Sequence, residues 1–107
     1  MRPKTPRMTA KESKQGYDRA ATRSFGLCEV CGARQATQMH HRLHRSHGGN
    51  ERPCNLLHLC LWCHADAHQH SERYANGWAV RTGYDPGLMP VLYRGALMIL
   101  TEDGGLF

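Results

Sequence analysis

The pattern of hydrophobic and polar positions changes along this 107-residue chain, and its first quarter is polar and rich in charged residues. Thr9 is followed by Glu12 three residues later, which is a capping-box pattern and predicts the start of a helix. We expect this helix to cover residues 10–23, although Gly16 weakens it. Because its face is mostly charged, we expect the helix to lie at the surface or along DNA.

The centre of the chain has the alternating pattern of a strand. Residues 36–43 alternate between two sides. One side carries Thr37, Met39 and His41, and the other carries Gln38, His40 and Arg42. A turn at residues 48–50 precedes a second, shorter strand at residues 55–57. A further helix is expected within residues 59–74, ended by the pair Asn76-Gly77.

The tail consists of short apolar runs separated by turn residues. Residues 78–82 predict a strand. Residues 90–93 and 96–100 flank Arg94-Gly95, and this pattern predicts a hairpin with a two-residue turn. We expect residues 102–107 to fray.

Composition indicates one small domain with a thin core. At 107 residues and a mean hydropathy of −0.61, the chain can bury little apolar area, and such domains are often held together by a metal or by disulfides. No apolar run approaches the length of a membrane span, and the N-terminal residues lack the apolar segment of a secretory signal. We therefore expect a soluble, cytoplasmic protein with no membrane partner.

The charge is concentrated at the N-terminal end. The formal net charge is +5, and residues 1–24 carry seven Lys/Arg and two acidic residues, whereas residues 25–107 are balanced. Residues 1–8 contain Pro3 and Pro6, so we expect a flexible basic arm there. Such an arm is typical of a protein that binds a polyanion, but a solubilising tail has the same composition.

The cysteines and histidines indicate metal binding. All five cysteines and all eight histidines lie between Cys28 and His70. Two C-x2-C pairs are formed by Cys28, Cys31, Cys60 and Cys63. In a reducing compartment, two such pairs favour a closed structural zinc site over disulfides. The fifth cysteine, Cys54, is expected to be a small buried residue.

The histidines predict a second, open site. His64 and His68 are four residues apart on the expected helix, so they share one face. With one imidazole from the strand they can hold a divalent metal that keeps open positions. Such a metal next to a free histidine is suited to hydrolysis.

Together these elements resemble the HNH (ββα-metal, or His-Me finger) endonuclease family, in particular its zinc-stapled phage and prophage branch. The matching motifs are Cys28-x2-Cys31, His40-His41, Gly48-Gly49, Asn55-Leu56, Leu59-Cys60-x2-Cys63-His64 and His68. The resemblance implies an α+β fold with a small ββα-metal core. In that fold a nuclease domain with a four-cysteine zinc site occupies residues 9–76, including an N-terminal helix. Residues 77–107 form a β-rich hairpin extension of the same domain.

The resemblance also implies a reaction, the metal-dependent hydrolysis of phosphodiester bonds in double-stranded DNA. His41 would be the general base, and His40, His64 and His68 would bind the catalytic metal. Asn55 would brace the loop that fixes the base or would contact the metal directly. Beside the structural Zn²⁺, one divalent metal (Mg²⁺, Mn²⁺, Ni²⁺ or Zn²⁺) would stabilise the scissile phosphate and the leaving 3′ oxygen. Many zinc-stapled members have Asp where this chain has His40, whereas colicin-type nucleases have the paired histidines. This difference leaves the metal preference open.

The loop beside the expected base carries further cationic residues. Arg42, His44, Arg45 and His47 are candidates for DNA phosphate contacts, although a solvated loop would look the same. The resemblance implies action in a bacterial host or phage-infected cell, with phage packaging proteins as candidate partners. An alternative is a non-catalytic, zinc-stapled module that binds nucleic acid through its basic arm.

Overall fold

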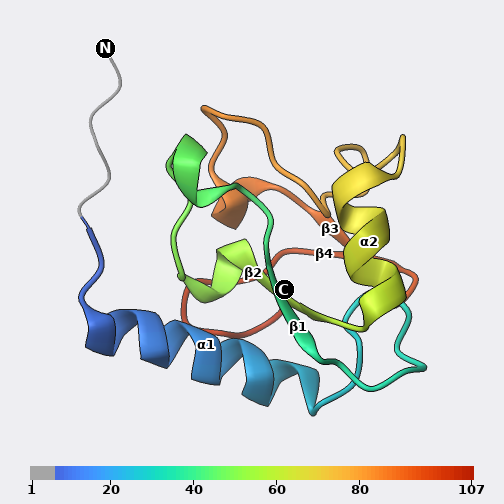
Figure 1. Cartoon of the computed structure of the whole chain (residues 1–107), viewed down its shortest axis with the longest axis horizontal. Helices are drawn as coiled ribbons and strands as arrows, with labels where there is room; N and C mark the ends of the chain where they lie inside the picture. Colours follow the sequence, from blue (N-terminus) through green and yellow to red (C-terminus); the bar gives the residue numbers. More distant parts are fainter. Residues whose placement is uncertain (1–6) are drawn as a thin grey trace.

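The structure, a computed structural model, describes residues 7–107, so most of the expected basic arm at residues 1–8 lies outside it. Its elements are α1 (Ala10–Ser24), β1 (Gln38–His41), η1 (Arg45–His47), η2 (Pro53–Asn55), β2 (Leu56–Leu59), α2 (Leu61–Gln69), η3 (Pro86–Leu88), β3 (Val91–Tyr93) and β4 (Ala96–Met98). The fold is α+β, with two α-helices and two small antiparallel sheets in the described part (Figure 1). No helix within residues 7–107 is long and apolar enough to cross a membrane.

Helix α1 begins where the sequence predicts. The Thr9 hydroxyl accepts a hydrogen bond from the Glu12 amide at 3.1 Å, and the Glu12 carboxylate accepts one from the Thr9 amide at 2.9 Å. The helix ends at Ser24, and the residue that caps it, Phe25, has a left-handed backbone conformation with φ 55°. The fold requires glycine at position 16, because a Cβ there would lie 1.7 Å from the carbonyl oxygen of Glu51. The glycine therefore lets α1 lie directly against the loop before β2.

Strands β1 and β2 form the first sheet, and α2 follows them closely. They pair antiparallel from Gln38 opposite Leu59 to His41 opposite Leu56. Both predicted strands are present, although β1 is shorter than residues 36–43. Helix α1 packs against β2, and α2 packs against both strands (Figure 1). The first sheet thus contacts both helices, and β1 and α2 lie against each other.

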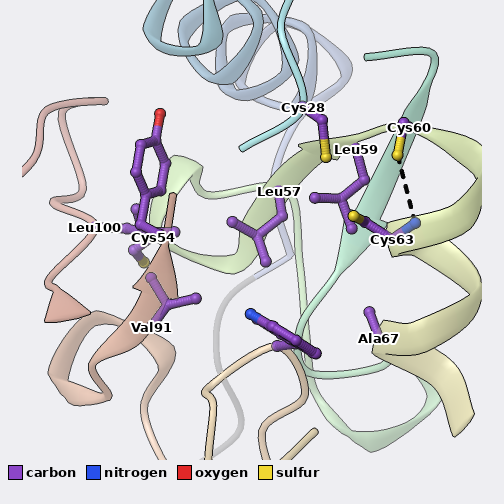
Figure 2. Packing of buried hydrophobic residues seen from close by; sticks show 11 residues of the cluster. Cys28, Cys54, Leu57, Leu59, Cys60, Cys63, Ala67, Val91 and Leu100 are labelled. Carbon is purple, nitrogen blue, oxygen red and sulfur yellow. Dashed lines mark hydrogen bonds between the residues drawn. The ribbon is translucent and has the colours of Figure 1, made fainter. Parts of the chain in front are cut away.

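The hydrophobic core lies between β2, α2 and the C-terminal hairpin. Its buried members are Cys28, Cys54, Leu57, Leu59, Cys60, Cys63, Ala67, Trp78, Val91, Tyr93 and Leu100. In Figure 2, Leu57 lies at the centre, with the sulfur atoms of Cys28, Cys60 and Cys63 beyond Leu59 on one side. Cys54 is fully buried among the apolar residues on the other side, as the sequence predicts (Figure 2).

The C-terminal hairpin is formed as predicted. Strands β3 and β4 pair around Arg94 and Gly95, which have φ values of 48° and 88°. The Arg94 guanidinium donates hydrogen bonds to the carbonyl oxygens of Ser24 and Leu27 at 2.9 and 3.0 Å. This arginine therefore attaches the hairpin to the segment just before the first cysteine pair.

Three other expectations for this half of the chain are wrong. Helix α2 ends at Gln69 and is followed by turns, so it ends before the expected stop at Asn76-Gly77. Residues 78–82 are irregular and do not form a strand. Their one backbone hydrogen bond to the first sheet's segment runs from the Val80 amide to the Arg42 carbonyl oxygen at 2.8 Å. Residues 102–107 do not fray, since Ile99 and Phe107 exchange two backbone hydrogen bonds at 2.8 Å.

Arg42 holds the C-terminal segment onto the first sheet. Its side chain is fully buried, and its guanidinium donates four hydrogen bonds of 2.7–3.0 Å to backbone carbonyls. The acceptors are the carbonyl oxygens of Cys54, Gly77, Pro86 and Met89. The expected contact of Arg42 with DNA phosphates is therefore wrong, because its side chain is fully buried and its guanidinium is bound to four backbone carbonyls.

Candidate metal centres and active site

Four cysteines from two distant segments meet at one point. The sulfur atoms of Cys28, Cys31, Cys60 and Cys63 all lie within 4.8 Å of one another, and each of these cysteines is free of disulfide bonds. In a tetrahedral zinc site with bonds of about 2.3 Å the sulfurs are roughly 3.8 Å apart, which fits this cluster. The four cysteines are therefore positioned to hold a metal ion.

The surroundings of the sulfurs favour bound thiolates. The amide of Ala33 points at the Cys31 sulfur at 3.5 Å, and the amide of Cys63 points at the Cys60 sulfur at 3.4 Å. Burial opposes ionisation of Cys31, but hydrogen bonds outweigh it and lower its pKa to about 6. Burial and the neighbouring sulfurs raise the pKa of Cys63. Four thiolates this close together need a cation between them.

Three histidines form a second cluster. His40 comes from β1, while His64 and His68 come from the same face of α2, and the ligand atoms of the three lie within 4.8 Å of one another. The Nε2 atoms of His64 and His68 are 3.1 Å apart. Two imidazole nitrogens on one metal with bonds of about 2.1 Å are separated by roughly 3.0 Å at right angles and roughly 3.4 Å in a tetrahedron, so this spacing fits a shared ion.

His40 is fixed in one tautomer. Its ring is buried, and its Nε2 lies 2.6 Å from the carbonyl oxygen of Trp78. Because a carbonyl only accepts, Nε2 must carry the hydrogen, which leaves the lone pair on Nδ1. That Nδ1 atom is buried and has no hydrogen-bond partner. Burial lowers the pKa of His40 to about 3, so the ring is neutral and ready to bind a cation.

The imidazoles from α2 are also kept neutral. Burial, together with the neighbouring histidines, lowers the pKa values of His64 and His68. Neutral imidazole is the form that binds a metal. The predicted grouping of these two residues with His40 is therefore what the structure shows, and the donor set suits a divalent ion.

The histidine cluster opens onto a surface depression. Its volume is about 300 Å³, and its lining residues are Met39, His40, His41, His44, Arg45, Ser46, His64 and His68. His44 and Arg45 are exposed at this depression, and the His44 ring is 5.8 Å from that of His68. His47 is exposed beside His44, with ring centroids 5.8 Å apart. A polyanion can therefore reach Arg45, His44 and His47, whereas Arg42 is out of reach.

His41 lines the same depression but belongs to a different hydrogen-bonded group. Its side chain is 18% exposed, and its Nε2 lies 2.9 Å from the Glu51 carboxylate. The ring of Tyr17, on α1, approaches it edge-on with centroids 6.2 Å apart. The structure thus places His40 with the α2 histidines and leaves the neighbouring His41 outside that cluster.

Glu51 is a site residue that the sequence analysis missed. Its carboxylate is 7% exposed and accepts a hydrogen bond from the Ser13 hydroxyl at 2.8 Å, with Arg45 3.5 Å away. Burial opposes its ionisation, but the hydrogen bonds from His41 and Ser13 outweigh burial and lower the pKa of Glu51 below its usual value. Ser13 and Glu51 are 38 positions apart, so no local pattern could have revealed this contact.

Asn55 braces the loop between the two strands. It is buried at the end of η2, where its Oδ1 accepts from the Leu43 amide at 2.8 Å. Its Nδ2 donates to the carbonyl oxygens of Leu43 and Asn50 at 3.1 and 2.8 Å. The hydrogen bonds of its side chain thus connect both ends of the loop that carries η1. Asn55 does not line the depression.

No protein-family profile, curated protein or solved structure matches this chain. A function for it must therefore rest on the chemistry of the two clusters, because a fold alone does not determine function. The four-cysteine cluster can hold a metal within the core. The three-histidine cluster can hold one at the surface.

Proposed function

We propose that this chain is a metal-dependent DNA endonuclease of the HNH type, with a ββα-metal core formed by β1, β2 and α2. The observation that carries this proposal is the buried, partnerless Nδ1 of His40. It lies beside His64 and His68, and all three open onto the depression that His41 also lines. Three neutral imidazoles with space in front of them, and a fourth histidine outside the set, suit metal-assisted hydrolysis.

Each cluster has its own metal in this proposal. The four cysteines hold a structural Zn²⁺, because tetrahedral thiolate sites are typical of zinc. His40, His64 and His68 hold the catalytic metal, and an all-imidazole set favours Zn²⁺ or Ni²⁺ over Mg²⁺. When bound there, a divalent metal supplies positive charge that stabilises the scissile phosphate and the leaving 3′ oxygen.

His41 is the general base in this proposal. Its Nε2 is engaged with Glu51, and no other group within residues 7–107 hydrogen bonds to its ring, so Nδ1 is free to accept a proton. His41 takes a proton from water as the water oxygen bonds to phosphorus and the bond to the 3′ oxygen breaks, and the departing 3′ oxygen takes a proton from solvent. The products carry a 5′-phosphate and a 3′-hydroxyl. Histidine is the side chain that most often serves as a general base.

Double-stranded DNA is the proposed substrate. Arg45, His44 and His47 lie at or beside the depression and are exposed, so they can contact phosphates on either side of the scissile bond. Such contacts position the DNA without reading its sequence. The proposed setting is phage DNA processing or packaging in the cytoplasm of a bacterial host, where packaging proteins would be the partners.

Nicking of supercoiled plasmid tests the proposal. Wild-type protein is assayed with Mg²⁺, Mn²⁺, Ni²⁺ or Zn²⁺, with and without chelator, beside His41→Ala. We expect metal-dependent nicking that chelator abolishes and that His41→Ala lacks. If both proteins bind DNA and neither cuts, the chain is instead a non-catalytic zinc module. If His41→Ala cuts like wild type, His41 is not the base.

A further inference from the structure

Glu51 holds the ring of His41 through one defined atom pair. Its Oε2 is 2.9 Å from His41 Nε2, and its Oε1 accepts from the Ser13 hydroxyl at 2.8 Å. The carboxylate is 7% exposed, so water does not compete freely for either oxygen. Both oxygens of Glu51 thus have hydrogen-bond partners, His41 on β1 and Ser13 on α1, and the Nε atom of Arg45 lies 3.5 Å from Oε2.

This contact selects the reactive nitrogen of His41. An ionised carboxylate only accepts hydrogen bonds, so Nε2 of His41 must carry a hydrogen and donate it to Glu51. In the neutral ring the lone pair is then on Nδ1. The same bond also fixes the orientation of the ring, so that Nδ1 keeps one direction.

Helix α1 keeps the carboxylate in this position. Gly16 lies so close to the Glu51 backbone that a Cβ there would be 1.7 Å from its carbonyl oxygen, and Ser13 lies one turn earlier on the same helix. Tyr17 of α1 also contacts the edge of the His41 ring. The backbone and the carboxylate of Glu51 are therefore both held by one helix face. That face also limits the rotation of His41.

We propose that Glu51 is the positioning residue of His41, and that Ser13 in turn orients Glu51. The inference rests on the proposed function, because it assigns Glu51 a role in that reaction. Glu51 is not a ligand in this account, since its carboxylate points to His41 and does not belong to the cluster of His40, His64 and His68. Helix α1 is thus part of the catalytic apparatus and not only a surface element.

Kinetics of plasmid nicking by the zinc-loaded protein test the role. Glu51→Ala removes both the acceptor and the charge, and we expect kcat to fall about 100-fold with KM for DNA unchanged. Glu51→Gln keeps an oxygen that can accept from Nε2, so we expect a smaller loss of about 10-fold. Ser13→Ala should lower kcat by about 3-fold, because one hydrogen bond that orients the carboxylate is lost.

Glu72→Gln is the matched control, because Glu72 is an exposed carboxylate remote in sequence from this group. It should retain wild-type kcat and KM. The melting temperature and the metal content of each variant are measured in parallel. A merely structural role of Glu51 would lower kcat only together with the melting temperature or the metal content. If Glu51→Ala does not fold, Glu51→Gln still tests the role of Glu51, because glutamine is isosteric and can keep the contacts with His41 and Ser13.

A spectroscopic measurement tests the contact without reference to cleavage. Proton–nitrogen correlation spectra of the zinc-loaded protein labelled with ¹⁵N-histidine distinguish the two imidazole tautomers. We expect His41 as the Nε2–H tautomer in wild type and as a mixture of tautomers in Glu51→Ala. An unchanged tautomer in Glu51→Ala overturns the inference, as does wild-type kcat in that variant. A wild-type protein that cuts no DNA overturns the proposed function, and the inference with it.

Discussion

The four-cysteine and three-histidine clusters use the same short helix for opposite purposes. Cys63 and His64 are neighbours in α2, yet Cys63 faces the core and His64 faces the depression. The cysteine cluster includes three residues of the hydrophobic core, whereas the histidine cluster borders a surface depression of about 300 Å³. Since neighbouring helix positions point in directions about 100° apart, one helix can serve both sites.

The two clusters differ in their number of potential ligands as well as in their burial. Four thiolates fill a tetrahedral site and leave no position for substrate, whereas three imidazoles leave at least one. A closed site can stabilise the fold but cannot bind a phosphate. An open site can do both, with fewer bonds to the metal. The comparison therefore predicts that damage to the cysteine cluster unfolds the protein, and that damage around the histidine cluster affects mainly the reaction.

The largest effect is expected from Cys60→Ser. Cys60 caps α2, belongs to the core and provides one of four ligand atoms. Structural zinc contributes about 10 kcal/mol or more of binding free energy in small zinc domains, so we expect the variant, or chelated wild type, to be largely unfolded. Circular dichroism and bound-zinc analysis measure this outcome. Cys54→Ser is the control, because Cys54 lies outside the cluster, and it should retain zinc.

His41→Ala should leave the fold and both metals in place. Removal of a general base costs roughly 10²- to 10⁴-fold in rate, so we expect a nicking rate reduced by that factor. Melting temperature and metal content should stay at wild-type values, because His41 is partly exposed and belongs to neither cluster. Loss of bound metal in this variant would contradict the separation of base from ligands.

Arg42→Met should loosen the histidine cluster before the cysteine cluster. The Arg42 guanidinium binds the carbonyl oxygen of Gly77, next to Trp78, whose own carbonyl holds His40. Losing a buried charge that satisfies four carbonyls should destabilise the fold by about 3 kcal/mol or more. We expect weaker metal binding at the histidine cluster with zinc retained by the cysteines. Loss of cysteine-bound zinc first would contradict this order.

Arg45→Ala should have the smallest effect. Its ion pair with Glu51 is exposed on the arginine side, and such pairs contribute about 0–1 kcal/mol, so the melting temperature should hardly change. Loss of one phosphate contact should raise KM for DNA a few-fold, about 3- to 10-fold, and reduce its salt dependence. Nicking at several salt concentrations measures both. An effect on kcat alone would place Arg45 elsewhere in the mechanism.

Features that depend on neighbouring residues were predictable from the sequence. The capping box of Thr9 and Glu12, the hairpin turn at Arg94-Gly95 and both C-x2-C pairs are local patterns, and each is present in the structure. For the same reason, the spacing of His64 and His68 predicted that they share one face of the helix.

Features that depend on distant contacts were not predictable. Arg42 has the sequence context of a surface cation in a basic loop, yet its acceptors come from segments 12 to 47 residues away. Glu51 looks like an ordinary loop carboxylate, and only its contacts with Ser13 and His41 distinguish it. Residues 78–82 have strand-forming side chains, yet the amides of Trp78 and Ala79 bond to the Arg73 carbonyl and only that of Val80 bonds to Arg42, so tertiary packing overrides propensity.

Cobalt substitution combined with plasmid nicking tests the central claim most directly. Cobalt-loaded wild type should bind two Co²⁺ per chain, one with the intense absorption of thiolate ligands and one without it. His68→Ala should lose only the second ion and should no longer nick DNA. Binding of a single Co²⁺ by wild type, or nicking by His68→Ala at the wild-type rate, would contradict the account of one closed and one reactive site.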